Sequence, residues 1–134
     1  MKKCALIFTL TMILLCACHR QDTTVQRNVV TEITISCHTG TQLIERHYTS
    51  QDKMRSVLLY IRSVDSPFSA QEEPGEGEGE RVSITTVSAD RTIKTYNQHG
   101  LRFFRKGEGK WKLIDPEKGA NLWLLIKLLP SDPE

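Results

Sequence analysis

Apolar and polar residues alternate along residues 31–48, and a Thr-Gly turn signal lies in the middle of this stretch. Period-two alternation around such a turn predicts a β-hairpin. With Thr-Gly as a two-residue turn, Ile35 lies opposite Ile44 on the apolar face, and Glu32 lies opposite His47 on the polar face. The Glu32–His47 pair is predicted to be a solvated ion pair between the two strands.

Beyond the hairpin, apolar residues recur every three or four positions through residues 51–64, which predicts an amphipathic helix. The sequence TSQD at residues 49–52 resembles a helix cap, because a hydroxyl is followed three residues later by a carboxylate. Residues 69–80 contain five Glu and no apolar residue after Ala70, so we expect a flexible acidic loop that does not pack.

Two more hairpins and a second helix are predicted in the rest of the chain. Residues 81–97 and 101–114 both alternate around a turn signal. Asp115 is a suitable N-cap, and the Pro-Glu that follows it suits a first helical turn. Residues 122–129 are apolar almost all round, so this helix is expected to be buried on several sides, Trp123 included, or covered by a partner.

The two halves resemble each other. Residues 33–48 align without gaps with residues 82–97 at an offset of 49, which places Ile44 on Ile93, and the two helical segments align at an offset of 66. This repeat predicts an α+β fold made of two ββα units, the second with an extra hairpin. The units would share one antiparallel sheet with both helices on one face, related by a pseudo-twofold axis, in a single domain of residues 31–134.

The start of the chain has the parts of a secretory signal. Two lysines follow Met1, and the apolar core that comes next is shorter than the ~20 residues a membrane span needs. Leu15-Cys16-Ala17-Cys18 resembles the lipobox of bacterial lipoprotein precursors. The resemblance implies cleavage after residue 17, a diacylglyceryl group on the Cys18 thiol and often a further acyl chain such as palmitate. An ordinary signal peptide cut elsewhere is the alternative.

If residues 1–17 are removed, polar residues 18–30 become a flexible tether between a membrane and the domain. The chain would then be exported and anchored in the cell envelope, on a periplasmic face or at the cell surface. Without Lys2 and Lys3, 16 basic residues balance 16 acidic ones, so the composition is not that of a globally basic nucleic-acid binder. Residues 18–80 nevertheless carry a net charge of −4 and residues 81–134 a net charge of +4. This asymmetry suits internal complementarity or a basic face for an anionic partner.

Candidate chemistry is sparse. Cys37 is the one cysteine left besides the lipid site, so it cannot form a disulfide within the chain, and its place in the alternation predicts a small buried side chain. No motif of a hydrolase, phosphate loop or redox enzyme is present. The spacing of His38, His47 and His99 matches no metal-site pattern. We therefore expect no enzymatic activity, no cofactor and no metal.

The third hairpin is the best candidate for a binding surface, because it interleaves basic and aromatic residues. The candidate surface consists of Arg102, Phe104, Lys106, Lys110 and Lys112. It would suit an anionic lipid or an acidic protein, and export argues against nucleic acid. The simpler interpretation is an amphipathic hairpin that buries Phe103 and Leu113. In both cases a three-residue turn places Arg105 opposite Trp111 as a cation–π pair.

The sequence as a whole predicts a membrane-anchored envelope lipoprotein whose domain is a non-catalytic protein-binding module. An inhibitor or immunity lipoprotein directed against an exported hydrolase or toxin is the alternative. The two differ in that an inhibitor has one tight enzyme partner.

Overall fold

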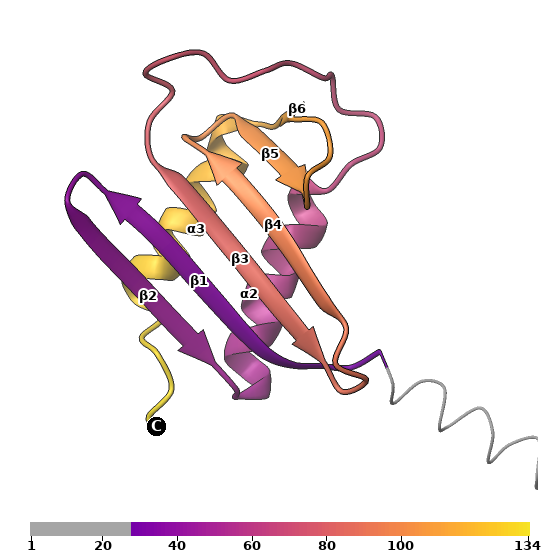
Figure 1. Ribbon diagram of the computed structural model, residues 1–134, viewed down its shortest axis with the longest axis vertical. Helices are drawn as coiled ribbons and strands as arrows, with labels where there is room; N and C mark the ends of the chain where they lie inside the picture. Colours follow the sequence, from indigo (N-terminus) through magenta and orange to yellow (C-terminus); the bar gives the residue numbers. More distant parts are fainter. Residues whose placement is uncertain (1–27) are drawn as a thin grey trace, which may run out of the picture.

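The computed structural model describes residues 28–134, so the predicted signal peptide, Cys18 and most of the predicted tether lie outside the described residues. The domain is one open antiparallel sheet with two helices, which confirms the predicted α+β fold (Figure 1). In sheet order the strands are β2 (Gln42–Tyr48), β1 (Val30–Thr39), β3 (Arg81–Ser88), β4 (Ile93–His99), β5 (Phe103–Lys106) and β6 (Lys112–Leu113). The helices are α2 (Gln51–Val64), which has the predicted bounds, and α3 (Pro116–Leu128).

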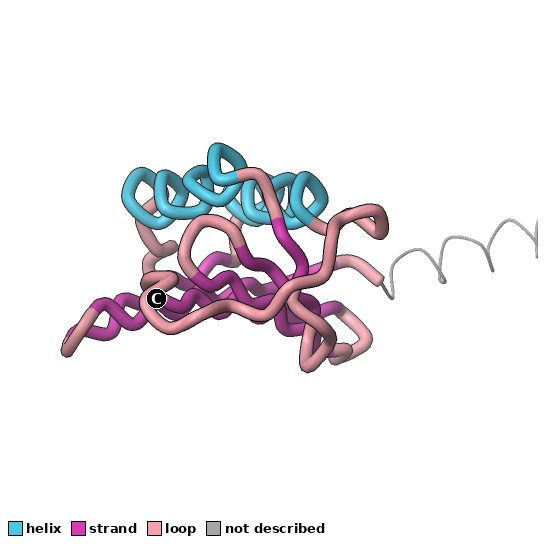
Figure 2. Tube along the Cα trace, turned by 90° about the horizontal axis from the view of Figure 1, so that it is seen from above, coloured by secondary structure: helices cyan, strands magenta, loops and turns pink. Residues whose placement is uncertain are grey.

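Both helices lie in one layer on one side of the sheet and run in opposite directions (Figures 1 and 2). Their inner faces pack on the inward residues of the strands, where Ile35 and Ile84 are each 1% exposed. Cys37 lies in the same core and is fully buried, as predicted. Burial raises the pKa of its thiol, so Cys37 behaves as a small apolar side chain.

The pairing of β1 with β3 supports the predicted pseudo-twofold relation. Ile35 and Ile84, which are equivalent at an offset of 49, lie directly opposite each other. Cys37 pairs with Val82 as Ile33 pairs with Thr86, so the register is symmetric about the central isoleucines. An axis normal to the sheet between β1 and β3 therefore relates the two units.

The gap-free alignment of the hairpins is wrong in their second strands. Gly40, at φ +58°, begins the first turn one residue later than predicted, so Ile44 lies opposite Cys37 on the helix-facing side rather than opposite Ile35. The second hairpin has a longer connection, and Ile93 lies opposite Val87 on the other face, where it is 65% exposed. The second strands are thus equivalent at an offset of 50.

The predicted alignment of the helices is also wrong by one residue. At an offset of 65 the burial patterns coincide: Val57 matches Leu122, and Ile61 matches Ile126, all of them buried. The outward positions Leu59 and Leu124 match as well. Trp123 is half-buried and Leu124 and Leu128 are exposed, so α3 is not buried on several sides. The other predicted possibility, a partner that covers this helix, stays a prediction.

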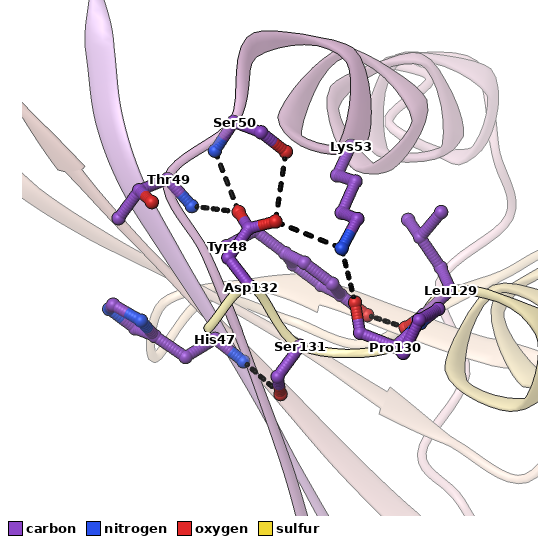
Figure 3. A network of polar contacts seen from close by, with 9 residues as sticks. All are labelled: His47, Tyr48, Thr49, Ser50, Lys53, Leu129, Pro130, Ser131 and Asp132. Carbon is purple, nitrogen blue, oxygen red and sulfur yellow. Dashed lines mark hydrogen bonds and ion pairs between the residues drawn. The ribbon is translucent and has the colours of Figure 1, made fainter. Parts of the chain in front are cut away.

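The two helices begin differently. Asp115 caps α3 as predicted, because its side chain accepts from the backbone N–H of Glu117 at 3.0 Å. The side chain of Ser50 makes no capping bond to α2. The carboxylate of Asp132 takes this role from beyond α3, accepting the backbone N–H groups of Thr49 and Ser50 at 2.7 Å (Figure 3).

Further bonds complete this contact, which we call the Asp132 clamp. The ammonium of Lys53 lies 2.9 Å from Asp132 and donates to the Pro130 carbonyl, and the Ser50 hydroxyl donates to the same carboxylate (Figure 3). The Tyr48 hydroxyl donates to the Leu129 carbonyl at 2.7 Å. The end of α3 is thereby fastened to the start of α2.

Candidate functional site

The third hairpin forms with the predicted register, but it presents a different surface. Arg105 lies over the Trp111 ring, 4.5 Å from its centroid, as predicted. Phe104, the aromatic member of the candidate surface, is 1% exposed and stacks on Tyr96 in the core. Phe104 is therefore excluded from any exposed binding surface. Alternation showed that Phe103 and Phe104 lie on opposite faces, but it did not show which face meets the helices.

The basic members of the candidate surface differ in exposure. Arg102, Lys106 and Lys110 are exposed. Lys112 is half-buried, and its ammonium lies 3.4 Å from the Ser66 carbonyl at the end of α2. An aromatic ring that the sequence reasoning overlooked, Phe68, lies two residues further along and is 95% exposed. The only sign of this exposed ring in the sequence was that Phe68 is an apolar residue within a polar linker.

The acidic loop is attached to the sheet at both ends. At its start, Leu113 donates to the Ala70 carbonyl and Glu72 donates to the Trp111 carbonyl. At its end, Gly100 donates to the Glu80 carbonyl. The prediction that this loop does not pack is therefore wrong, since backbone hydrogen bonds require no apolar side chain.

A hollow of about 680 Å³ separates the middle of this loop from the sheet. Glu73 and Glu76 line it from the loop. Trp111 and three nitrogen-bearing side chains line it from the sheet face that points away from the helices. These three are Arg81, His99 and Arg105. We call this space the loop hollow.

A second hollow lies between the two helices, on the outer side of the helix layer. This α2–α3 groove measures about 420 Å³ and is lined mostly by leucine side chains. Leu59, Leu124 and Leu128 are 55%, 52% and 70% exposed, which is unusual for three neighbouring leucines. The pseudo-twofold relation puts matching positions on its two walls, because Leu59 corresponds to Leu124 and Tyr60 to Leu125.

The exposed charges of the helix layer are mainly basic. Arg55 and Arg62 border Leu59 on α2, and Lys118 donates to the Ser63 carbonyl at the end of the groove. Lys127 is exposed on α3. The exposed acidic residues of both helices lie in their first turns, where they suit the helix dipole.

Residues 28–134 contain no group of three His, Cys, Asp or Glu side chains that is placed to hold a metal ion. Among the same residues, neither helix is long and apolar enough to cross a membrane. Comparison of the chain with protein-family models, with characterised proteins and with solved structures found no significant match.

Proposed function

We propose that this protein is a cell-envelope lipoprotein, anchored through Cys18, whose domain is a non-catalytic protein-binding module. The anchor rests on the lipobox-like residues 15–18 and on the signal-like segment before them. Val30 already belongs to β1, so a mature chain would have about a dozen residues between the lipid and the sheet.

Replacing Cys18 with alanine tests the anchor. Cells that express the wild-type chain and are fed a labelled fatty acid should yield a labelled protein. The Cys18→Ala chain should stay unlabelled and keep its signal segment, because it lacks the acceptor thiol. Equal labelling of the two chains would rule out the lipoprotein assignment.

The α2–α3 groove carries the proposal of protein binding. Its exposed leucines line a groove between two helices, and an amphipathic helix that lays its apolar face in such a groove is a recurring mode of peptide recognition. Because the surrounding exposed charges are basic, the occupant we propose is an amphipathic helix of an envelope protein with acidic residues beside its apolar stripe. Burial of three leucines that are now half-exposed would supply the main driving force.

A photo-cross-linking amino acid at Leu128 tests this occupant in intact cells. It should yield one discrete adduct, and the cross-linked peptide should have apolar residues at helical spacing with acidic neighbours. Leu124→Glu in the same chain should abolish the adduct. Leu43→Glu is the matched control, because Leu43 is 55% exposed on the opposite face of the sheet.

The identity of the cross-linked molecule shows whether an acidic amphipathic helix occupies the groove. A second copy of this chain, a lipid adduct or an adduct that survives Leu124→Glu would contradict the proposed occupant. If the partner is an exported hydrolase or toxin whose activity falls on binding, the module is the inhibitor or immunity lipoprotein that the sequence left as an alternative.

A further inference from the structure

The loop hollow has walls of opposite charge. Five glutamates lie between residues 72 and 80, in the half of the chain with net negative charge, and two of them, Glu73 and Glu76, line the hollow. The opposite wall belongs to the positively charged half, with Arg81 on β3 and Arg105 on β5. The hollow therefore lies where the two halves of opposite charge face each other.

These opposite charges do not pair with each other. Within residues 28–134, no glutamate of the loop lies within 4.0 Å of a Lys or Arg nitrogen. The one ion pair of Arg105 is with Glu108, which is in the turn after β5, 94% exposed and at 3.7 Å. The loop thus holds its carboxylates across a gap from the guanidinium groups.

The sheet wall also contains polar atoms without partners. His99 is 8% exposed, and its Nδ1 is buried and makes no hydrogen bond to any of residues 28–134. The Nε of Arg105 is likewise buried and unpaired. Buried groups of this kind are rare in folded proteins because each one costs free energy. Both residues line the same hollow, but these two atoms have no exposed surface of their own, so a ligand would contact the terminal guanidinium nitrogens of Arg105 instead.

Trp111 forms the apolar part of the same wall. Its ring contacts the imidazole of His99, at a centroid distance of 6.0 Å, and the guanidinium of Arg105 lies over it at 4.5 Å. These contacts fix the positions of both nitrogen-bearing groups. A ligand with a short apolar body between its charges would contact the indole while its ends reach the two walls.

We propose that the loop hollow binds a small zwitterion, namely an amino acid or short peptide with free termini. The ligand's ammonium group lies toward Glu73 and Glu76. Its carboxylate accepts hydrogen bonds from the guanidinium groups of Arg81 and Arg105. The volume lies within the range of about 300–1,000 Å³ that is usual for small-molecule sites. This site is separate from the α2–α3 groove, so the proposal does not depend on the proposed function.

Four peptides that differ only at their ends test the proposal on the full-length chain in detergent. They are trialanine, acetyl-trialanine, trialanine amide and acetyl-trialanine amide, and calorimetry gives the dissociation constant of each. Trialanine carries both charges and should bind most tightly. Blocking either end removes charge-assisted hydrogen bonds, which should weaken binding at least about tenfold.

Substitutions assign each end to its wall. In the double variant Arg81→Gln/Arg105→Gln, blocking the carboxyl end should no longer weaken binding, whereas blocking the amino end still should. The double variant Glu73→Gln/Glu76→Gln should show the reverse pattern. Lys94→Gln is the control because Lys94 is exposed on β4 and lies outside the hollow.

Each alternative result contradicts the proposal. If acetyl-trialanine binds as tightly as trialanine, the hollow is an anion site and the loop glutamates have no role. If all four peptides bind equally, neither charged wall takes part. If trialanine shows no saturable binding up to its solubility limit, the hollow is not a site for zwitterions. The peptide series uses the wild-type chain, so an unfolded variant cannot obscure these results.

Discussion

The two ββα units follow the same plan, but they are completed by different means. The second unit starts its helix with its own cap, Asp115, and brings α3 close to the sheet through Gly119. The first unit fills the equivalent position with Met54 and relies on Asp132, far away in the sequence, to finish the start of its helix. Similar hydrophobic patterns thus give the two units similar burial, but only the first unit depends on a distant residue to complete the start of its helix.

Alanine substitutions at the equivalent positions Met54 and Gly119 should cause the largest losses of stability. Met54 is 2% exposed, so Met54→Ala should leave a cavity and cost about 2–5 kcal/mol of unfolding free energy. Gly119→Ala should cost about 3 kcal/mol or more for the opposite reason, since its Cβ would lie 2.0 Å from the Leu101 carbonyl oxygen, which belongs to the backbone.

Urea denaturation of each variant measures both costs. Gly75→Ala is the control, because the nearest atom to its added Cβ would be a glutamate side-chain oxygen at 3.9 Å. If Gly119→Ala is as stable as this control, α3 lies further from Leu101 in solution than in the structure.

Substitutions of Gln98 and Tyr48, which are equivalent at the offset of 50, should differ by an intermediate amount in the stability they remove. The Gln98 amide accepts from the Tyr60 hydroxyl and donates to the carbonyls of Gly100 and Gly119 at 2.8 and 3.0 Å. Burial raises the pKa of Tyr60, so its hydroxyl remains a donor over the whole working range of pH.

Gln98→Leu removes three buried hydrogen bonds and should cost about 2–4 kcal/mol. Tyr48→Phe removes one bond, to the half-buried end of α3, and should cost about 1 kcal/mol. Thermal and urea melts of the two variants compare these losses. Equal losses would show that Gln98 is no more central to its unit than Tyr48.

The smallest effects, at the two caps, differ in pH dependence. Asp115→Ala should cost about 1 kcal/mol, the usual value for an N-cap. The Lys53 ammonium, with the backbone N–H groups of Ser50 and Thr49, holds the pKa of Asp132 well below its usual range. Its contribution is therefore fully present above the unfolded-state pKa of about 3.9 and is lost as the pH falls toward the folded value.

Urea midpoints of the wild type and of Asp132→Asn, measured from neutral pH into acid, test this point. The gap between them should stay constant down to about pH 5 and narrow below about pH 4. A gap that keeps its size in acid would mean that the variant acts through something other than the charge of Asp132.

Local patterns predicted the elements well but not their relations. The bounds of α2 and the Arg105–Trp111 pair followed from periodicity and a short turn. The register of the first hairpin was wrong by two residues, yet Glu32 and His47 still lie 2.8 Å apart, because a shift of two keeps side chains on the same face.

What could not be predicted depends on contacts between distant segments. Phe104 was placed on the wrong face because alternation has no absolute direction. Asp132 carries no local sign that it caps a helix some eighty residues earlier. The loop hollow required the loop and the sheet to be placed together, so the sequence revealed only its ingredients, five glutamates and a basic hairpin.

The Asp132 clamp also imposes an order on folding. Its bonds to Thr49 and Ser50 close a loop of more than eighty residues, and contacts of such separation form late. A chain made from its N-terminus exposes β1, β2 and α2 long before residue 132 exists. Until then the backbone N–H groups of Thr49 and Ser50 lack the carboxylate that accepts them in the folded domain. The first ββα unit is therefore completed only after the second unit has brought Asp132 into place.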